Sequence, residues 1–308
     1  MKKWLAATGL STALLLGACS TESPVSEGND NEGTEGGSED FTVGFSVSTL
    51  NNPFFVTLEE GAEVKASELG LDLVTVDAQD DSSKQISDVE DLIQRGVDLI
   101  VINPTDSSAV TAAIEAANNA DIPVITVDRG ADGGEVVTHI ASDNIAGGEL
   151  AGELMVELVG EGAKVAELEG IPGSSAARER GEGFNNIAAD SLDVVAKQTA
   201  NFDRAEGLTV MENILQGNSD IQGVFAHNDE MALGALEAIE AAGQDDIVII
   251  GFDATTDAVE AVGNDRMAGT VAQQPTIIGY EALEAANSVL NGEDVEDFIP
   301  VDLELIKK

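Results

Sequence analysis

The 308-residue chain carries 58 acidic residues against 14 Lys and Arg, a formal net charge of −44 at pH 7. This excess excludes nucleic acid as a partner, because phosphate binding needs clustered Lys and Arg. A hydrophobic content of 43% still predicts a folded body, so we interpret the charge as a solvated acidic surface of the halophilic kind. Because cations are so scarce, each arginine is a candidate for a specific function. Three of the six arginines are Arg129, Arg178 and Arg180.

The first 18 residues have the pattern of an export signal. Met1 and two lysines precede an apolar run at 4–16 that is too short to span a bilayer as a helix. The run ends in Leu-Gly-Ala-Cys, which resembles the lipobox of bacterial lipoproteins. We therefore predict a signal peptide at 1–18, lipidation of Cys19 and an anchor to the outer face of the cell membrane. The alternative is an ordinary signal peptide with an incidental cysteine.

Residues 19–40 connect the predicted lipid anchor to the rest of the chain. They are acidic and rich in Ser, Gly and Asn, with almost nothing apolar to bury. This composition predicts a disordered tether, because burial cannot offset the cost of ordering it. Cys19 is the only cysteine, so an exported body has no disulfides and depends on its core.

From residue 41 onward, strand-like and helix-like patterns alternate. Strands are predicted at 41–47, 73–76, 99–102, 124–127, 136–140, 164–168, 194–197, 223–226 and 247–252. Helices are predicted at 53–69, 83–95, 107–120, 145–159, 174–189, 204–216 and 230–242. The alternation predicts an α/β protein with parallel sheets flanked by helices, and its length predicts two lobes.

The strand at 124–127 ends on a pair of opposite charges, Asp128 and Arg129, followed by Gly130. Ligands of open parallel sheets bind beyond the carboxyl ends of the strands, so this pair is a candidate site. A surface ion pair at a strand end is the alternative that these residues leave open.

An internal repetition supports the first interpretation. Asn103 and Asn228 each end an apolar strand, and an acid ends the next strand in each half, Asp128 and Asp253. The interval from Asn to Asp is 25 residues in both halves, and the halves are offset by 125. Two similar lobes therefore present matching polar residues, which predicts a cleft lined from both sides.

Asn, Asp, Arg and Gln beside phenylalanines suit a neutral polyhydroxylated ligand. Carboxylates accept from hydroxyl groups, guanidinium groups donate to them, and aromatic faces pack on the C–H faces of a sugar. Phosphate-binding glycine loops, nucleophile elbows and paired-histidine metal motifs do not occur, so we expect no enzyme, cofactor or metal. His139 is expected to be structural, whereas His227 either lines the cleft or packs beside it.

Several segments resemble periplasmic ribose-binding proteins, over essentially residues 41–308. They are residues 45–55, ending Asn-Asn-Pro-Phe-Phe, and 103–106, 122–129, 139–144, 175–184 and 228–236. The resemblance implies two Rossmann-like lobes joined by a three-segment hinge near 142–143, 273–274 and 302–303. The N-terminal lobe would be 41–142 plus 274–302, and the C-terminal lobe 143–273 plus 303–308.

The resemblance also implies a set of ribose contacts. Carried over position by position, they are Asn52, Phe54, Phe55, Asn103, Asp128, Arg129, Arg180, Phe202, Asn228, Asp253 and Gln273. In the family, phenylalanines sandwich the pyranose ring and the other residues bind its hydroxyls and ring oxygen. His227 stands where glutamine is expected, a departure that we expect to alter affinity modestly.

The implied function is that of a monomeric, exported substrate-binding lipoprotein that delivers D-ribose to an ABC permease. A chemoreceptor is a further candidate partner. The alternatives are a binding protein for another sugar, such as allose, xylose or a furanose signal molecule, and a sugar-sensing regulator. The regulator would need a basic helix-turn-helix, where residues 1–40 offer a signal and an acidic tether instead.

Overall fold

The computed structural model describes residues 41–308. The predicted signal peptide, the lipidation of Cys19 and the acidic tether lie outside the described residues. Within 41–308, none of the helices combines the length and hydropathy that crossing a bilayer requires.

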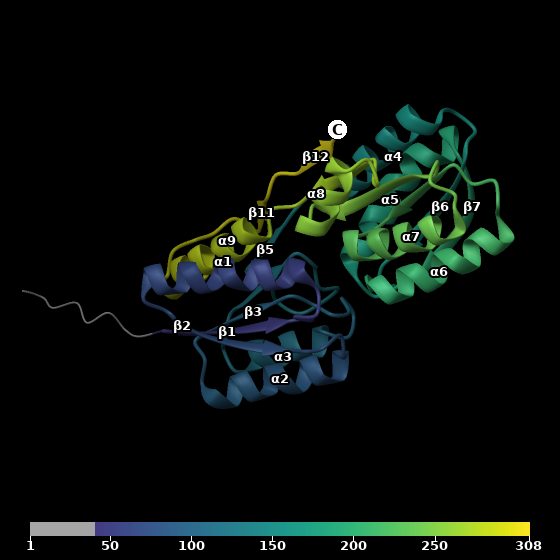
Figure 1. The fold of residues 1–308 in the computed structure, drawn as a ribbon. Coiled ribbons are helices and arrows are strands. Elements are labelled where there is room, and N and C mark those ends of the chain that lie inside the picture. Colours follow the sequence, from purple (N-terminus) through teal and green to yellow (C-terminus); the bar gives the residue numbers. More distant parts are fainter. Residues whose placement is uncertain (1–40) are drawn as a thin grey trace, which may run out of the picture. The chain divides into compact units, whose positions relative to one another are not determined.

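The first sheet has six strands, all parallel, in the order β11-β5-β4-β3-β1-β2. These strands are β1 (Thr42–Val47), β2 (Asp72–Asp77), β3 (Leu99–Ile102), β4 (Val124–Val127), β5 (Thr138–Ala141) and β11 (Phe298–Pro300). Helices α1 (Pro53–Leu69) and α9 (Pro275–Leu290) form a core with one face, and α2 (Ser82–Arg95) and α3 (Thr111–Asn119) with the other. Because both faces are covered, β3 and β4 are apolar at nearly every position (Figure 1).

The second sheet also has six strands, in the order β12-β10-β9-β8-β6-β7. They are β6 (Lys164–Glu169), β7 (Asp193–Thr199), β8 (Gly223–Ala226), β9 (Val248–Asp253), β10 (Gly269–Ala272) and β12 (Glu304–Lys307). The helices are α4 (Asn144–Val159), α5 (Ser175–Ser191), α6 (Arg204–Gly217), α7 (Asp229–Ala242) and α8 (Thr256–Gly263). Helices α4 and α5 pack on one face and α6, α7 and α8 on the other. Only β12 is antiparallel among these strands, paired with β10.

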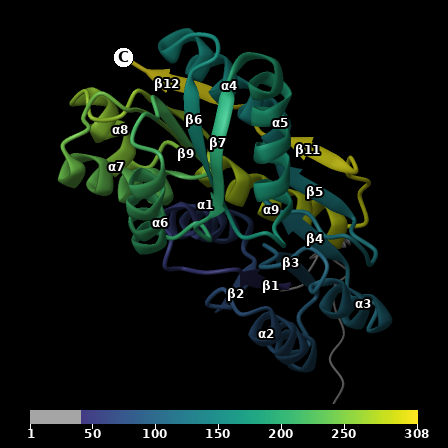
Figure 2. The ribbon, with the colours of Figure 1, turned by 90° about the vertical axis from the view of Figure 1, so that its right-hand side faces the viewer.

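Three segments connect the two sheets, as Figures 1 and 2 show. The chain passes from β5 to α4, from β10 to α9, and from β11 to β12. The two-lobed α/β fold with three connections is therefore confirmed. The exact bounds of the lobes stay a prediction.

The predicted elements differ from the observed ones mainly at their ends. The helix expected at 107–120 begins only at Thr111, because Asp106 Oδ1 accepts hydrogen bonds from the backbone N–H groups of Ser108 and Ala109 and holds a turn there. The strand expected at 136–140 lies at Thr138–Ala141. The prediction ends with the strand at 247–252 and does not include the later elements α8, β10, α9, β11 and β12.

Candidate functional site

A pocket lies between the carboxyl ends of the two sheets, and its free space of about 230 Å³ is partly open to solvent. The residues that line it are Asn52, Phe54, Phe55, Asp128, Arg129, Ala176, Arg180, Phe202, Asn228, Asp253 and Gln273. All but one of the residues carried over from the resemblance are in this set. Ala176 was not predicted, since a small apolar side chain gives no chemical signal in a sequence.

The start of α1 places two aromatic rings at the pocket. Asn52 caps the helix by accepting a hydrogen bond from Phe54 N (2.9 Å), and Pro53 occupies the first helical position. The rings of Phe54 and Phe55 are buried and meet edge to face, with centroids 5.2 Å apart. Helix capping therefore fixes the two rings next to the strand ends.

The strand β4 delivers the charged pair Asp128 and Arg129 to the same place. Both side chains are buried, and Asp128 has a left-handed backbone (φ 60°), which Asp adopts more readily than most residues. The guanidinium carbon of Arg129 lies 5.0 Å from the ring centroid of Phe55 and 5.1 Å from that of Phe202. The two rings, one on α1 and one on the loop between β7 and α6, thus contact the cation from the two lobes.

Asn103 lies behind Asp128 and is not among the lining residues. Its Nδ2 donates to Val127 O (3.0 Å) and to Asp128 Oδ2 (3.3 Å), while its Oδ1 accepts from Ser48 N (3.3 Å). In this arrangement, the amide orients the carboxylate.

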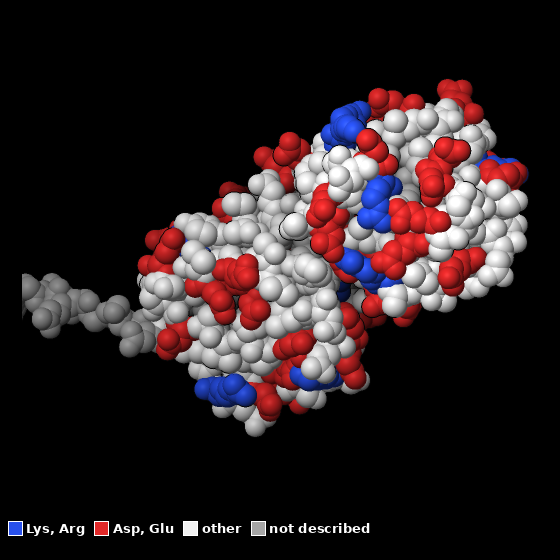
Figure 3. All heavy atoms as spheres, in the orientation of Figure 1, with Lys and Arg blue, Asp and Glu red and all other residues white. Residues whose placement is uncertain are grey.

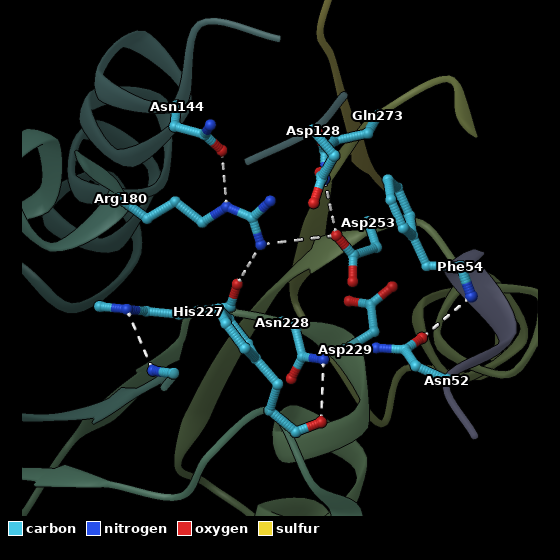
Figure 4. A network of polar contacts seen from close by, with 12 residues as sticks. Asn52, Phe54, Asp128, Asn144, Arg180, His227, Asn228, Asp229, Asp253 and Gln273 are labelled. Carbon is cyan, nitrogen blue, oxygen red and sulfur yellow. Dashed lines mark hydrogen bonds and ion pairs between the residues drawn. The ribbon is translucent and has the colours of Figure 1, made fainter. Parts of the chain in front are cut away.

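The second sheet contributes a matching wall centred on Arg180. Its Nη1 donates to the backbone oxygen of His227 (2.7 Å) and lies 3.6 Å from Asp253 Oδ1 (Figure 4). Gln273 Nε2 donates to the same Asp253 oxygen (2.9 Å). Asn228 caps α7 by accepting from Met231 N (3.0 Å). Polar groups from the ends of β8, β9 and β10 and from α5 therefore meet at the pocket.

Phe202 closes the pocket from the loop after β7. Its backbone has a positive φ of 61°, and its oxygen accepts a hydrogen bond from Asn228 Nδ2 (3.2 Å). The ring lies directly against Gly170, where any side chain would overlap it. Glycine is therefore required at position 170 for the ring to reach the pocket.

Burial dominates the electrostatics of the site. It raises the pKa of Asp253 to about 7, although nearby Arg180 opposes the shift. Behind Asp253, burial also raises the pKa of Asp229, which accepts hydrogen bonds from Thr270 and Thr255. Burial lowers the pKa of Arg129, against the effect of Asp128. Each wall of the pocket thus contains one buried cation beside one buried carboxyl group. The pairs are Arg129 with Asp128 and Arg180 with Asp253.

Three buried polar atoms of the pocket have no hydrogen-bond partner among the described residues. They are Asp128 Oδ1, Arg129 Nε and Gln273 Oε1. An unpaired buried polar group costs about 1–3 kcal/mol, so such atoms are expected to pair with a ligand. Two acceptors and one donor beside aromatic rings match the hydroxyl groups and C–H faces of a polyol.

The two histidines lie outside the pocket. His227 is fully buried, and its Nε2 is 3.0 Å from Oε1 of Glu167, which does not line the pocket either. His139 contacts Thr126 through Nδ1 (3.0 Å) and packs near Phe298. Across residues 41–308, no cluster of His, Cys, Asp and Glu is arranged to bind a metal ion.

Fold and site together define a two-lobed α/β binding protein with its pocket between the lobes. The chain belongs to the periplasmic binding protein family: the model described as "Periplasmic binding protein domain" matches residues 43–294.

Its curated relatives include ribose import binding proteins. That of Bacillus subtilis (strain 168) is 55% identical over 305 residues, covering 99% of each chain. That of Escherichia coli (strain K12) is 53% identical over 268 residues, covering 87% of this chain and 90% of the relative. These relatives are import binding proteins and not enzymes.

Solved structures show the same fold with different ligands. A Caulobacter myo-inositol binding protein bound to myo-inositol superposes with a TM-score of 0.84 at 34% identity, covering 88% of this chain and 94% of that one. A periplasmic solute binding protein from Actinobacillus succinogenes 130z, with bound D-allose, has a TM-score of 0.82 at 31% identity, covering 87% and 98%.

Proposed function

We propose that this protein binds D-ribose in the pocket between its lobes and delivers it to the membrane permease of an ABC importer. The observation that carries the proposal is the set of buried unpaired atoms on Asp128, Arg129 and Gln273 next to aromatic rings. The names of relatives at more than 50% identity support ribose as the sugar. The protein is proposed to perform no chemistry of its own.

In this proposal, the predicted contacts have three tasks. Phe54, Phe55 and Phe202 pack against the sugar ring. The charged side chains exchange hydrogen bonds with hydroxyl groups and the ring oxygen, and the amides complete the set, since an amide both donates and accepts. The residues are Asn52, Asp128, Arg129, Arg180, Asn228, Asp253 and Gln273, and Asn103 acts from behind by orienting Asp128. A wrong sugar is rejected because it leaves some of these buried groups unpaired.

Calorimetry tests the proposal directly. Purified residues 41–308 are titrated with ribose, arabinose, xylose, allose and glucose at high salt, and ribose is expected to bind most tightly. Tighter binding of allose or xylose would favour the alternative, a binding protein for another sugar. Folded protein that binds none of them would overturn the proposal.

Closure of the two lobes around ribose is proposed as the signal to the permease. Domains joined by a few connecting segments close by hinge rotation about those segments. The bounds proposed for the lobes are 41–142 plus 274–302 and 143–273 plus 303–308. Small-angle scattering with and without ribose is expected to show a smaller radius of gyration in the complex.

The cellular setting is proposed from residues 1–40. A lipid on Cys19 would hold a monomeric binding protein at the outer face of the membrane, close to the permease and to any chemoreceptor. Mass spectrometry of membrane fractions tests this, with Cys19→Ala as the control. A wild-type protein that is released as readily as the variant would exclude the anchor.

A further inference from the structure

Asn144 is a buried polar residue that neither lines the pocket nor belongs to the predicted site. It is the first residue of α4, directly after the first connection between the sheets, and only 2% of its surface is exposed. Asp143 caps the helix by accepting from Ala146 N (2.9 Å), which fixes the backbone at this point. The position of the Asn144 side chain is therefore determined by the start of the helix.

The amide of Asn144 connects two charged side chains of α5. Its Oδ1 accepts from Arg180 Nε (2.8 Å), and its Nδ2 donates to Glu179 Oε2 (3.2 Å), as Figure 4 shows for the arginine. A guanidinium only donates and an ionised carboxylate only accepts. The amide can therefore adopt only one of its two flipped orientations, with the oxygen toward Arg180.

The hydrogen bond from Arg180 Nε to Asn144 adds a further contact that holds the Arg180 guanidinium in place. Nη1 is held by the His227 oxygen, and the guanidinium carbon lies 3.9 Å from the ring centroid of Phe252. With Nε held by Asn144, the group cannot rotate. Nη2 makes no hydrogen bond to the residues that the structure describes, and Arg180 lines the pocket.

Close packing of α4 on α5 sets the distance that the amide spans. A side chain at Gly148 would overlap the backbone oxygen of Arg180, and one at Gly183 would overlap that of Ile145. The two helices therefore approach within backbone contact. The short side chain of asparagine suits this gap.

We propose that Asn144 is a positioning residue that orients Arg180 for ribose before the sugar arrives and does not touch the sugar itself. The inference rests on the proposed function for its binding readout. The opposite wall has an equivalent arrangement, in which the buried amide of Asn103 donates a hydrogen bond to Asp128 and orients it. Orientation in advance raises affinity, because the side chain loses less freedom on binding.

The first test is Asn144→Ala, with Asn186→Ala as the matched control. Asn186 also joins the two helices, through Glu149 Oε1 (3.0 Å), but it is exposed and does not line the pocket. Ribose affinity is expected to fall about tenfold to a hundredfold in Asn144→Ala, the effect of losing a hydrogen bond to a charged group, and less than about twofold in the control. Equal affinities in the two variants would overturn the inference.

A double-mutant cycle separates positioning from general damage to the fold. In an Arg180→Ala background, Asn144→Ala is expected to cause no further loss of affinity. A full additional loss would show that Asn144 acts independently of Arg180 and would overturn the inference. Asn144→Asp combined with Glu179→Gln exchanges the amide and the carboxylate, and is expected to restore most of the affinity.

A readout without sugar keeps the inference distinct from the proposed function. The Nε–H proton of Arg180 is expected to give a slowly exchanging NMR signal, assigned by its loss in Arg180→Lys. Asn144→Ala is expected to make this proton exchange rapidly. An unchanged signal would overturn the inference, whereas absent ribose binding by the wild type would overturn only the proposed function.

Discussion

Asp128 and Asp253 end corresponding strands of the two sheets, β4 and β9, and both have a positive φ, 60° and 119°. They enter one pocket from opposite walls. Backbone conformations of this kind cost of order 1–3 kcal/mol and persist where the surrounding structure enforces them. The repetition in the sequence thus corresponds to a repeated, strained geometry at the site.

Asp128→Asn is expected to weaken ribose binding about a hundredfold or more while the protein stays folded. Asparagine accepts the positive φ, so the variant removes mainly the charge facing Arg129, and disrupting a buried charged pair costs about 2–5 kcal/mol. Calorimetry measures the loss. The matched control is Asp121→Asn, because Asp121 also has a positive φ (58°) but is exposed. Wild-type affinity in Asp128→Asn would contradict the site assignment.

Ser175→Ala is expected to weaken the contact between the lobes beside the pocket. Ser175 Oγ accepts from Gly130 N (2.8 Å), while Ser175 N donates to Ser107 Oγ (3.1 Å). The variant removes the first of these bonds, which is worth about 0.5–1.5 kcal/mol, so ribose should dissociate roughly two- to tenfold faster. Stopped-flow measurements test this, with the exposed Ser87→Ala as the control.

The contribution of Asp253 to the stability of the protein is expected to fall as the pH rises from about 4 to about 7. Burial raises the pKa of Asp253 from 3.8 to about 7, so the folded protein keeps a proton that the unfolded chain loses in this range. Its contribution is therefore complete below pH 4 and lost above pH 7. Asp229 acts in the same direction, since its pKa is also raised by burial.

Thermal denaturation at high salt measures this dependence, because salt screens the repulsion between surface acids. The melting temperature of Asp253→Asn is expected to vary less with pH than that of the wild type, by several degrees over this range. Identical profiles would show that Asp253 is ionised throughout.

His227→Leu is expected to lower the stability of the protein. His227→Gln is expected to keep the ribose affinity within a few fold of the wild-type value. Burial lowers the pKa of His227, so the ring is neutral, and its Nδ1 faces the Gly170 N–H (3.4 Å). Nε2 then donates to Glu167 Oε1, and leucine leaves this buried carboxylate short of a partner at a cost of about 1–3 kcal/mol.

Glutamine keeps a donor, and the backbone oxygen that binds Arg180 is unaffected. Denaturant melts and calorimetry of both variants provide the measurement. A change in affinity of more than about tenfold in His227→Gln would mean that the ring reaches the sugar.

Low salt is expected to destabilise the protein. The net charge is −44, and acidic side chains spread over the face drawn in Figure 3 with few cations between them. Their mutual repulsion extends over about 30 Å at 0.01 M salt and about 3 Å at 1 M. The melting temperature should therefore rise by several degrees between these salt concentrations. Full stability in dilute buffer would contradict the halophilic interpretation.

The fold and most of the pocket could be predicted because their signals are local. Apolar runs such as Val124–Val127 indicate buried strands whatever surrounds them. Strand ends collect at one edge of a parallel sheet, so order alone could assign Asn103 and Asp128 to one edge, and Asn228 and Asp253 to the matching edge of the second sheet. The resemblance added the remaining positions.

The sequence by itself therefore determined the alternation of strands and helices, the two similar halves and the residue types at the strand ends. Only the tertiary structure decided that Asn103 lies behind Asp128, that Ala176 lines the pocket and that Asn144 holds Arg180. Hydrophobic periodicity depends on neighbours within a few residues, whereas hydrogen bonds between distant side chains depend on how closely two helices pack. That distance is set by contacts of small residues such as Gly148 against a backbone far along the chain.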